Sequence, residues 1–404
     1  MGTILLPLQR LEMLLSDLHP SPKHPPQVIV REIDSSSQQD LPTTTLETKS
    51  QTDPRRDSGA SIAQPQTQTA LVITPSRTYQ LTSDFPAPAS PGPGEVVIRT
   101  RAAGLNHIDW KSVEHNFCLP ALPWVVGREM AGVVEGVGAG VEGVRRGDRV
   151  WTSTYYKDRR AGCFQELVVV PAHTVARMPA NLGFASASCL GVGGLTAAMT
   201  LWRWLGLPMH PPPADGPGGA RQVILIWGGS TVTGQFAVQL AAHVGWDVIA
   251  VCSDRTADLV RRLGPKHVVT YSGRADGEIV DEIHALGRGR ISKAIDLVGP
   301  QTARVVLDVI ARSEGVVDFA PLAFVSSKEA IPASARVHNV EMKQFVLDRA
   351  SEVYAKRLNE LVESGVVVIP KLRVIQGLGA VEGGLKQLKE GDLAGDKLVV
   401  SLSV

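Results

Sequence analysis

The most informative segment of this chain is Val223-Ile-Leu-Ile-Trp-Gly-Gly-Ser-Thr-Val-Thr-Gly234, and Gln235-Phe-Ala-Val-Gln-Leu-Ala-Ala242 follows it directly. The apolar run before the glycines is typical of a buried strand, and the residues after them favour a helix. Glycines allow a close backbone approach, and the amides at a helix N-terminus attract a pyrophosphate. The glycine spacing differs from the standard dinucleotide motif, so the turn alone leaves open an ordinary tight turn.

The next predicted strand, Trp246-Asp-Val-Ile-Ala-Val-Cys252, ends in Ser253-Asp-Arg-Thr256. This tetrapeptide lies roughly twenty residues after the turn, where a dinucleotide fold contacts the ribose. Ser253, Arg255 and Thr256 favour a 2′-phosphate and therefore NADPH. Asp254 would suit NADH, or it caps the helix that follows.

Composition excludes several classes of function. The chain has 404 residues, a net charge of +1 and 44% hydrophobic residues, which is typical of a soluble protein of about two to three domains without a nucleic-acid partner. We expect no membrane span and no signal peptide. The four cysteines show no C-x-x-C spacing, which indicates reduced thiols and a cytoplasmic location.

Residues 1–68 differ from the rest of the chain. After a leucine-rich start they consist largely of Ser, Thr, Gln and Pro, which cannot bury enough apolar surface to offset chain entropy. We therefore predict a disordered N-terminal extension. The leucine-rich start, interrupted by Pro7, is alternatively an amphipathic partner helix, or the extension is an artefact of gene prediction.

The remaining chain shows two patterns. From Thr69 to about residue 185, short strands are punctuated by Pro and Gly, as in an antiparallel β domain. Beyond Arg221, strands alternate with helices, which predicts an α/β fold with a doubly wound parallel sheet. The predicted strands of this sheet cover residues 223–227, 248–252, 267–270, 293–297 and 315–319.

Several ordered motifs together resemble the medium-chain dehydrogenase/reductase superfamily. They are Ala102-Ala-Gly-Leu-Asn-His-Ile-Asp109, Gly127-Arg-Glu-Met-Ala-Gly-Val-Val-Glu135, Gly147-Asp-Arg-Val150, the glycine-rich turn and Gly391-Asp-Leu-Ala-Gly-Asp-Lys-Leu-Val-Val400. The resemblance implies a GroES-like catalytic domain at 69–195, a Rossmann cofactor domain at 196–365, and a return to the catalytic domain at 366–404. The active site would lie in the cleft between the two domains.

Missing residues indicate a zinc-independent branch. Where zinc alcohol dehydrogenases of this fold have a cysteine and a histidine, the resemblance places Asn106 and Arg128, and the four-cysteine structural zinc lobe is absent. Zinc requires three or four N, S or O ligands, and Cys163 with His173 does not complete a set. We therefore expect no metal. Hydride addition to an activated C=C is then favoured over alcohol oxidation.

Within this branch, Asn106-His-Ile-Asp-Trp-Lys111 and the turn Gly-Gly-Ser-Thr-x-Thr resemble the trans-acting enoyl reductases of fungal polyketide synthases. The resemblance implies cofactor contacts at Ile108, Asp109, Trp110, Lys111, Ser230, Thr231, Val232, Thr233, Ser253, Asp254, Arg255, Thr256, Tyr271, Leu393 and Ala394. It implies substrate contacts around residues 341–345 and at Ala197, Ala198, Met199, Thr200, Leu201, Trp202, Arg203 and Trp204.

The implied reaction is NADPH-dependent reduction of the α,β-double bond of a polyketide thioester in secondary metabolism. The implied partner is a polyketide synthase or its acyl carrier domain, and the protein would be a monomer or a homodimer. Two alternatives stay open. One is a stand-alone NADPH quinone or enone oxidoreductase, and the other is a non-catalytic NADPH-binding protein.

Lys111 is the candidate catalytic residue, as a stabiliser of developing charge or a cofactor anchor; alternatively it is a solvated helix lysine. For Asp109 we favour a role as a helix cap over a role as a general base. Phe117 stands where some enoyl reductases of the superfamily have a tyrosine donor. Tyr155 or Tyr156 could supply the proton instead. Alternatively these tyrosines only pack against their neighbours and water supplies the proton.

Three further features have both a functional and a structural interpretation. Trp202 and Trp204 line an acyl channel or belong to the core. Residues 158–160 meet a carrier protein or form a solvated loop. For Arg128, whose guanidinium needs a partner if buried, we predict an ion pair with Glu129 or Glu135.

Overall fold

The alternating strands and helices after residue 221 form a six-stranded parallel sheet in the computed structural model, which describes residues 66–213, 221–391 and 393–402. The strand order is β11-β10-β9-β12-β13-β14, so the chain winds outward in both directions from the central strands. The strands are β9 (Val223–Trp227), β10 (Asp247–Cys252), β11 (His267–Thr270), β12 (Ile291–Asp296), β13 (Val317–Pro321) and β14 (Ala335–Val337).

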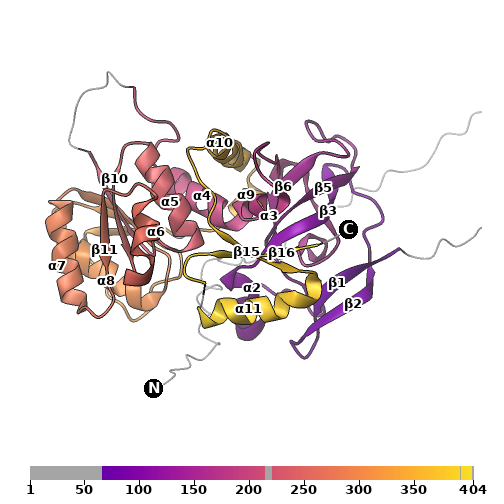
Figure 1. The fold of residues 1–404 in the computed structure, drawn as a ribbon, viewed down its shortest axis with the longest axis horizontal. Coiled ribbons are helices and arrows are strands. Elements are labelled where there is room, and N and C mark those ends of the chain that lie inside the picture. The colour runs from indigo at the N-terminus through magenta and orange to yellow at the C-terminus, as the bar shows by residue number, and fades with distance from the viewer. Residues whose placement is uncertain (1–65, 214–220, 392, 403–404) are drawn as a thin grey trace, which may run out of the picture. The chain divides into compact units, whose positions relative to one another are not determined.

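Apolar residues on both faces of this sheet account for the helices around it (Figure 1). Ile224 and Ile226 of β9 belong to the core beneath α5 and α6, whereas Val223 and Leu225 belong to the core beneath α7 and α8. Such strands are buried on both sides, which explains their continuous hydrophobic sequence. The helices are α5 (Val232–His243), α6 (Ala257–Arg261), α7 (Asp276–Gly287) and α8 (Pro300–Ala311).

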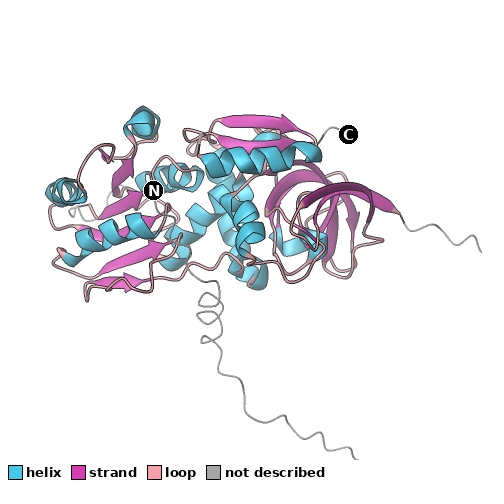
Figure 2. Cartoon of the chain, turned by 90° about the horizontal axis from the view of Figure 1, so that it is seen from below, coloured by secondary structure: helices cyan, strands magenta, loops and turns pink. Residues whose placement is uncertain are grey.

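The β-rich part contains a seven-stranded sheet and a three-stranded sheet (Figure 2). The larger sheet has the order β15-β16-β3-β5-β6-β8, with β7 also paired to β3, and the smaller has the order β2-β1-β4. The strands are β1 (Thr67–Ile73), β2 (Tyr79–Pro86), β3 (Glu95–Gly104), β4 (Trp124–Val125), β5 (Glu129–Val137), β6 (Arg149–Ser153), β7 (Leu167–Pro171), β8 (Val175–Arg177), β15 (Leu372–Gln376) and β16 (Lys397–Ser401).

The C-terminal segment returns to this β-rich part. β16 pairs antiparallel with β3, and β15 pairs parallel with β16. α11 (Val381–Glu390) packs against α2 (His107–His115), and Lys389 forms an ion pair with Glu114 at 2.7 Å between the two helices (Figure 1). β15 and β16 therefore belong to the same sheet as β3. The predicted domain boundaries at residues 69, 196 and 366 stay predictions.

A helical segment connects the two parts. It comprises α3 (Phe184–Ala187), the π-helical turn η3 (Leu190–Gly194), α4 (Leu195–Met199) and the π-helical turn η4 (Thr200–Trp204). Phe184–Trp204 is one helical segment of 21 residues with a mean hydropathy of 1.4, long and apolar enough by length and composition alone to cross a membrane. Burial of 78% of its most apolar window explains this composition, because the segment is the central core helix of the fold.

Most predicted strands of the parallel sheet lie where the sequence placed them. The strands at 223–227 and 267–270 have the predicted bounds, whereas β13 begins two residues later than predicted because Ser313–Gly315 form the preceding turn. The short helix α9 (Gln344–Leu347) and the longer helix α10 (Glu352–Glu363) complete the described fold. Residues 1–65 of the predicted extension lie outside the described residues.

Candidate active site

The glycine-rich turn between β9 and α5 has the geometry of a phosphate site. Gly228 has a φ of +90°, and a Cβ on Gly234 would lie 2.1 Å from the carbonyl oxygen of Gly228. Thr231 caps α5 by accepting a hydrogen bond from the amide of Gly234 at 3.0 Å. The amides of Val232 and Thr233, in the first helical turn, have no intrahelical acceptor. They are therefore available to an anion at the positive end of the helix dipole.

The C-terminal return contacts this turn directly. The Gln235 side-chain amide donates to the carbonyl oxygens of Ser230 (2.9 Å) and Gly395 (2.7 Å). Leu393 is buried and Ala394 adopts a left-handed φ of +48°. The structure thus brings Leu393 and Ala394, predicted as cofactor contacts, beside the predicted contacts at Ser230 to Thr233.

The end of β10 lies beside the same turn. Gly228 and Gly229 donate their amides to the carbonyl oxygen of Val251, one residue before the strand ends. The hydroxyls of Ser253 and Thr256 lie 3.0 Å apart, and the side chains of Asp254 and Arg255 are exposed. Asp254 does not cap α6, because Thr256 occupies the cap position.

Tyr271 follows β11 and is 41% exposed. Its ring is nearly parallel to that of Trp227, with 8° between the planes and 6.3 Å between the centroids. Trp227 is buried at the end of β9, so Tyr271 lies over the carboxyl edge of the sheet. Ligands of doubly wound sheets bind at this edge.

The predicted cofactor contacts Ile108 to Lys111 form the first turn of α2. Asp109 is completely buried and accepts a hydrogen bond from the amide of Asn106 at 2.8 Å, which agrees with its predicted capping role. Lys111 is half-buried with its ammonium 5.6 Å from the ring centroid of Trp110, and burial lowers its pKa. No ion pair among the described residues includes Lys111.

Asn106, Glu129 and Lys397 form a buried polar cluster. The ammonium of Lys397 lies 2.5 Å from a carboxylate oxygen of Glu129 and donates to the amide oxygen of Asn106 at 2.8 Å. Asn106 donates to Glu129 at 3.0 Å, and the other oxygen of Glu129 accepts from the amide of Val192. The cluster connects the N-terminus of α2 with β5, β16 and η3, and its partners are up to 291 residues apart in the chain.

The predicted ion pair of Arg128 is wrong. Glu129 is paired with Lys397, and Glu135 accepts two hydrogen bonds from Arg99 on the neighbouring strand β3. Successive residues of an extended chain point to opposite sides, so Arg128 faces away from Glu129. Both predicted partners are therefore occupied elsewhere.

Arg128 instead lies in a separate buried environment. It is 8% exposed, and its Nη2 donates to the carbonyl oxygen of Cys118 at 3.2 Å. The guanidinium carbon lies 5.2 Å from the ring centroid of Tyr156. Burial raises the pKa of Tyr156, and Tyr155 packs edge-on against it at 4.9 Å between centroids.

The predicted substrate contacts lie along α4 and η4, where the side chains from Ala197 to Leu201 are buried in the core. Trp202 is 7% exposed and packs against Tyr354, as expected of a core residue, whereas Trp204 is only half-buried. Arg203 forms an ion pair with Asp348 at 2.7 Å. Contact with a substrate along this segment stays a prediction.

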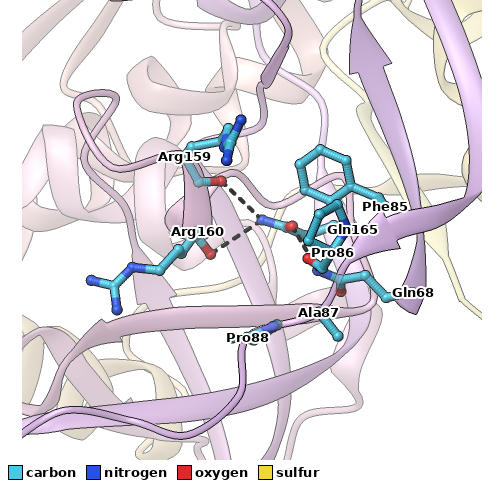
Figure 3. A pocket seen from close by; sticks show the side chains of 8 residues that line it. All are labelled: Gln68, Phe85, Pro86, Ala87, Pro88, Arg159, Arg160 and Gln165. Carbon is cyan, nitrogen blue, oxygen red and sulfur yellow. Dashed lines mark hydrogen bonds between the residues drawn. The ribbon is translucent and has the colours of Figure 1, made fainter. Parts of the chain in front are cut away.

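Two small cavities lie away from the predicted cofactor contacts. One has a volume of about 160 Å³ and lies between the end of β2 and residues 159–165 (Figure 3). Its Gln165 amide donates to the carbonyl oxygens of Arg159 and Arg160, and none of the predicted site residues lines it. The other, of about 120 Å³, is lined by Tyr155 and Val346, next to the predicted substrate segment 341–345.

No group of three or more His, Cys, Asp and Glu side chains with the geometry of a metal site occurs within residues 66–213, 221–391 and 393–402. Burial raises the pKa of the Cys163 and Cys189 thiols. Asp158 and Glu95 both pair with Arg160, so the loop at 158–160 has internal partners for its charges.

Sequence analysis missed two residues that organise the site. Gln235 connects the glycine-rich turn to the C-terminal return, and Lys397 neutralises Glu129. A charged residue that opens the otherwise apolar strand Lys397-Leu-Val-Val400 was the available signal, because a buried lysine requires a partner. The partner itself lies in a distant segment and is visible only in the fold.

Comparison with known proteins identifies the family. Residues 92–180 match the alcohol dehydrogenase GroES-like domain, and residues 233–363 match the zinc-binding dehydrogenases. Trans-enoyl reductase resD of Aspergillus sclerotiorum is 29% identical over 360 residues, which cover 82% of this chain and 99% of the relative. Dehydrogenase azaJ of Aspergillus niger is 30% identical over 354 residues, which cover 82% and 98%.

A solved quinone oxidoreductase of Pseudomonas syringae pv. Tomato DC3000 shares the fold, with a TM-score of 0.66 and 23% identity over 83% of this chain and 98% of that chain. The predicted fold class, a GroES-like part with a Rossmann part, is confirmed. The chain belongs to the medium-chain dehydrogenase/reductase superfamily and is an oxidoreductase.

Proposed function

We propose that this protein is a metal-free enoyl reductase that uses NADPH to reduce the α,β-double bond of a polyketide thioester. The acyl group would be carried by a polyketide synthase in the cytoplasm, and the reductase would act as a separate polypeptide. The name of its relative resD, a trans-enoyl reductase, supports this assignment. The observation that carries it is the Asn106–Glu129–Lys397 cluster, whose polar groups bind one another and thus leave no ligand set for a catalytic metal.

Superfamily membership implies a nicotinamide dinucleotide, and the described residues fit one. A Cβ at Gly228 or Gly234 would clash with neighbouring atoms of the chain, so the glycines allow the turn to close tightly before α5. The amides of Val232 and Thr233 would bind the pyrophosphate, and Tyr271 would lie beside the adenosine half. When bound, the reduced dinucleotide supplies a hydride for the β-carbon of the substrate.

The residues of α2 would position the cofactor for this step. The cap between Asp109 and Asn106 fixes the start of the helix, and the clustered Asn106 is in turn held by Lys397. Lys111 would anchor the cofactor with its partly desolvated ammonium. Proton delivery to the α-carbon falls to water or to Tyr156, the tyrosine nearer to Arg128.

The preference for NADPH is tested at the end of β10. Arg255→Ala removes a charge-assisted contact to the 2′-phosphate, worth about 1.5–3 kcal/mol. We expect the KM for NADPH to rise roughly tenfold to hundredfold, with no change for NADH. Arg261→Ala, in the adjacent helix, is the matched control and should change neither constant. Equal losses with both cofactors would contradict the assignment of Arg255.

The reaction is tested by the absorbance of reduced nicotinamide. The full chain is mixed with NADPH and crotonyl- or 2-methylcrotonyl-pantetheine, and a simple quinone is assayed in parallel. We expect thioester turnover with little quinone turnover. Quinone-only turnover would instead indicate a quinone oxidoreductase. Tight NADPH binding without turnover, even with the acyl group on a carrier domain, would indicate a non-catalytic binding protein.

A further inference from the structure

Arg128 is a buried cation with no ion pair among the described residues, and the carboxyl whose charge acts on it most is that of Asp109. No ion pair among them includes it, because its sequence neighbour Glu129 is held by Lys397 and Glu135 by Arg99. A guanidinium presents five N–H donors, and the hydrogen bond to the carbonyl oxygen of Cys118 uses one of them. The other N–H groups of the guanidinium can donate hydrogen bonds to a ligand.

The two groups that contact the guanidinium of Arg128 directly are neutral. The ring of Tyr156 supports one face, and the carbonyl oxygen of Cys118 fixes one nitrogen. The Oδ1 atom of Asp109 is buried and has no hydrogen-bond partner, so two incompletely bonded groups of opposite charge lie near each other. Burial raises the pKa of Asp109 to about 7, so this carboxyl is only partly ionised near neutral pH.

This environment adjoins the predicted cofactor contacts. Asp109 lies in the same helical turn as Ile108 and Lys111, and Cys118 follows the end of that helix. The Lys111 ammonium, by contrast, lies against the ring of Trp110. Of the two cations, Arg128 is the more deeply buried, and charge stabilisation is stronger where water is excluded.

We propose that Arg128 binds the carbonyl oxygen of the acyl thioester and stabilises the negative charge that develops on it during reduction. This assignment rests on the proposed enoyl reductase function. As hydride from the reduced nicotinamide adds to the β-carbon, the π electrons of the C=C bond shift and give an enolate on the thioester oxygen. Arg128 stays protonated and donates hydrogen bonds to that oxygen. The α-carbon then takes a proton from water, which restores the C=O bond, and the cofactor leaves oxidised.

The test compares turnover with enolate binding. Arg128→Met keeps an unbranched apolar side chain and removes the donors, and Arg128→Lys keeps the charge with fewer donors. We expect kcat/KM for crotonyl-pantetheine to fall by about 10²–10³ in Arg128→Met, as on loss of an oxyanion donor, and by a smaller factor in Arg128→Lys. Arg99→Met, the same substitution at an arginine of β3 that pairs with Glu135, should retain activity.

Enolate binding is measured with acetoacetyl-pantetheine in the presence of NADP⁺, by the ultraviolet band of the enolate. Wild type should form the bound enolate and Arg128→Met should not, while both bind NADP⁺ and the saturated butyryl thioester equally. Equal enolate formation by both proteins, or loss of NADP⁺ binding by the variant, would overturn the assignment. A wild type that binds the enolate but reduces no enoyl thioester would refute the proposed reaction and leave the oxyanion site intact. If wild type does neither, both proposals fail.

Discussion

The glycine-rich turn and the buried polar cluster shape the same site by opposite means. The turn consists of backbone and small residues that are neighbours in sequence, Gly228 to Gly234, and its geometry follows from excluded Cβ atoms. The cluster consists of long charged side chains, Glu129 and Lys397, which come from strands far apart in the chain. Local sterics thus shape the glycine-rich turn, whereas charge compensation between distant segments stabilises the polar cluster.

This contrast predicts that substitutions in the turn and in the cluster impair different properties of the protein. A change in the turn should affect cofactor binding more than folding, because the turn lies at the carboxyl edge of the sheet and contains no charged residue. A change in the cluster should affect folding first, because an unpaired buried charge costs several kcal/mol. The substitutions below test this difference, from the largest expected effect to the smallest.

Lys397→Met should have the largest effect. It leaves the completely buried Glu129 without its cation, and breaking a buried pair in this way costs about 3–5 kcal/mol. The free energy of unfolding in urea measures the loss. The double variant Lys397→Met/Glu129→Gln removes both charges and should recover most of it. If the single variant is as stable as wild type, the cluster does not hold the fold.

Asp109 should give the protein a pH-dependent stability. Its pKa is raised from 3.8 to about 7 by burial; Arg128 and Lys397 lower it and Glu129 raises it, without cancelling the effect of burial. The native state keeps this proton up to about pH 7, and the unfolded state loses it near pH 4. The native state therefore binds more protons in this window, and its stability falls as the pH rises.

Asp109→Asn removes this dependence. Since about 1.4 kcal/mol corresponds to each pKa unit, wild type should lose a few kcal/mol relative to the variant between about pH 4 and pH 7. Denaturant unfolding of both proteins at several pH values provides the difference. This comparison cancels the contribution of Asp296, whose pKa burial raises to about 6. A constant difference across the window would show that Asp109 keeps an ordinary pKa.

Gly234→Ala tests the glycine-rich turn itself. The new Cβ would lie 2.1 Å from the carbonyl oxygen of Gly228, an overpacking that costs about 1–3 kcal/mol. We expect NADPH affinity, measured by fluorescence titration, to fall by roughly tenfold or more. Gly277→Ala in α7, where nothing lies within 4 Å, is the control and should bind normally. Unchanged affinity in Gly234→Ala would place the cofactor away from this turn.

Arg99→Met should have the smallest effect. Its pair with Glu135 lies in the same sheet as the buried cluster, but the two side chains are 31% and 34% exposed. Exposed pairs contribute at most about 1 kcal/mol. The thermal midpoint should therefore change little, in contrast to Lys397→Met. A loss as large as that of Lys397→Met would mean that burial does not distinguish the two pairs.

Much of the fold could be predicted from local sequence. The strands at 223–227 and 267–270 were predicted with their observed bounds, because apolar runs end at glycine or polar residues. The cap formed by Asp109 was also predictable, since it acts on a residue three positions away. The role of the helical segment Phe184–Trp204 was harder to predict from sequence, because its composition fits both a membrane span and a core helix.

The candidate site was predicted only in part. Ser230 to Thr233, Leu393 and Ala394 were named from the resemblance, and the structure brings these two distant segments together through Gln235. The ion pair predicted for Arg128 was wrong, because adjacency in sequence places Glu129 on the opposite side of the extended chain. Charge pairing depends on which strands meet, and strand order is not a local property.

The sequence by itself determined the glycine-rich turn, the alternation of strands and helices and the family of the protein, because these depend on residue size, hydrophobic period and spacing within short segments. Only the tertiary structure decided which charges compensate each other. Lys397 pairs with Glu129 because β16 returns to pair with β3. Arg128 donates instead to the carbonyl oxygen of Cys118. Electrostatic energy depends on distance in space and on burial, and both are set by the assembled sheet.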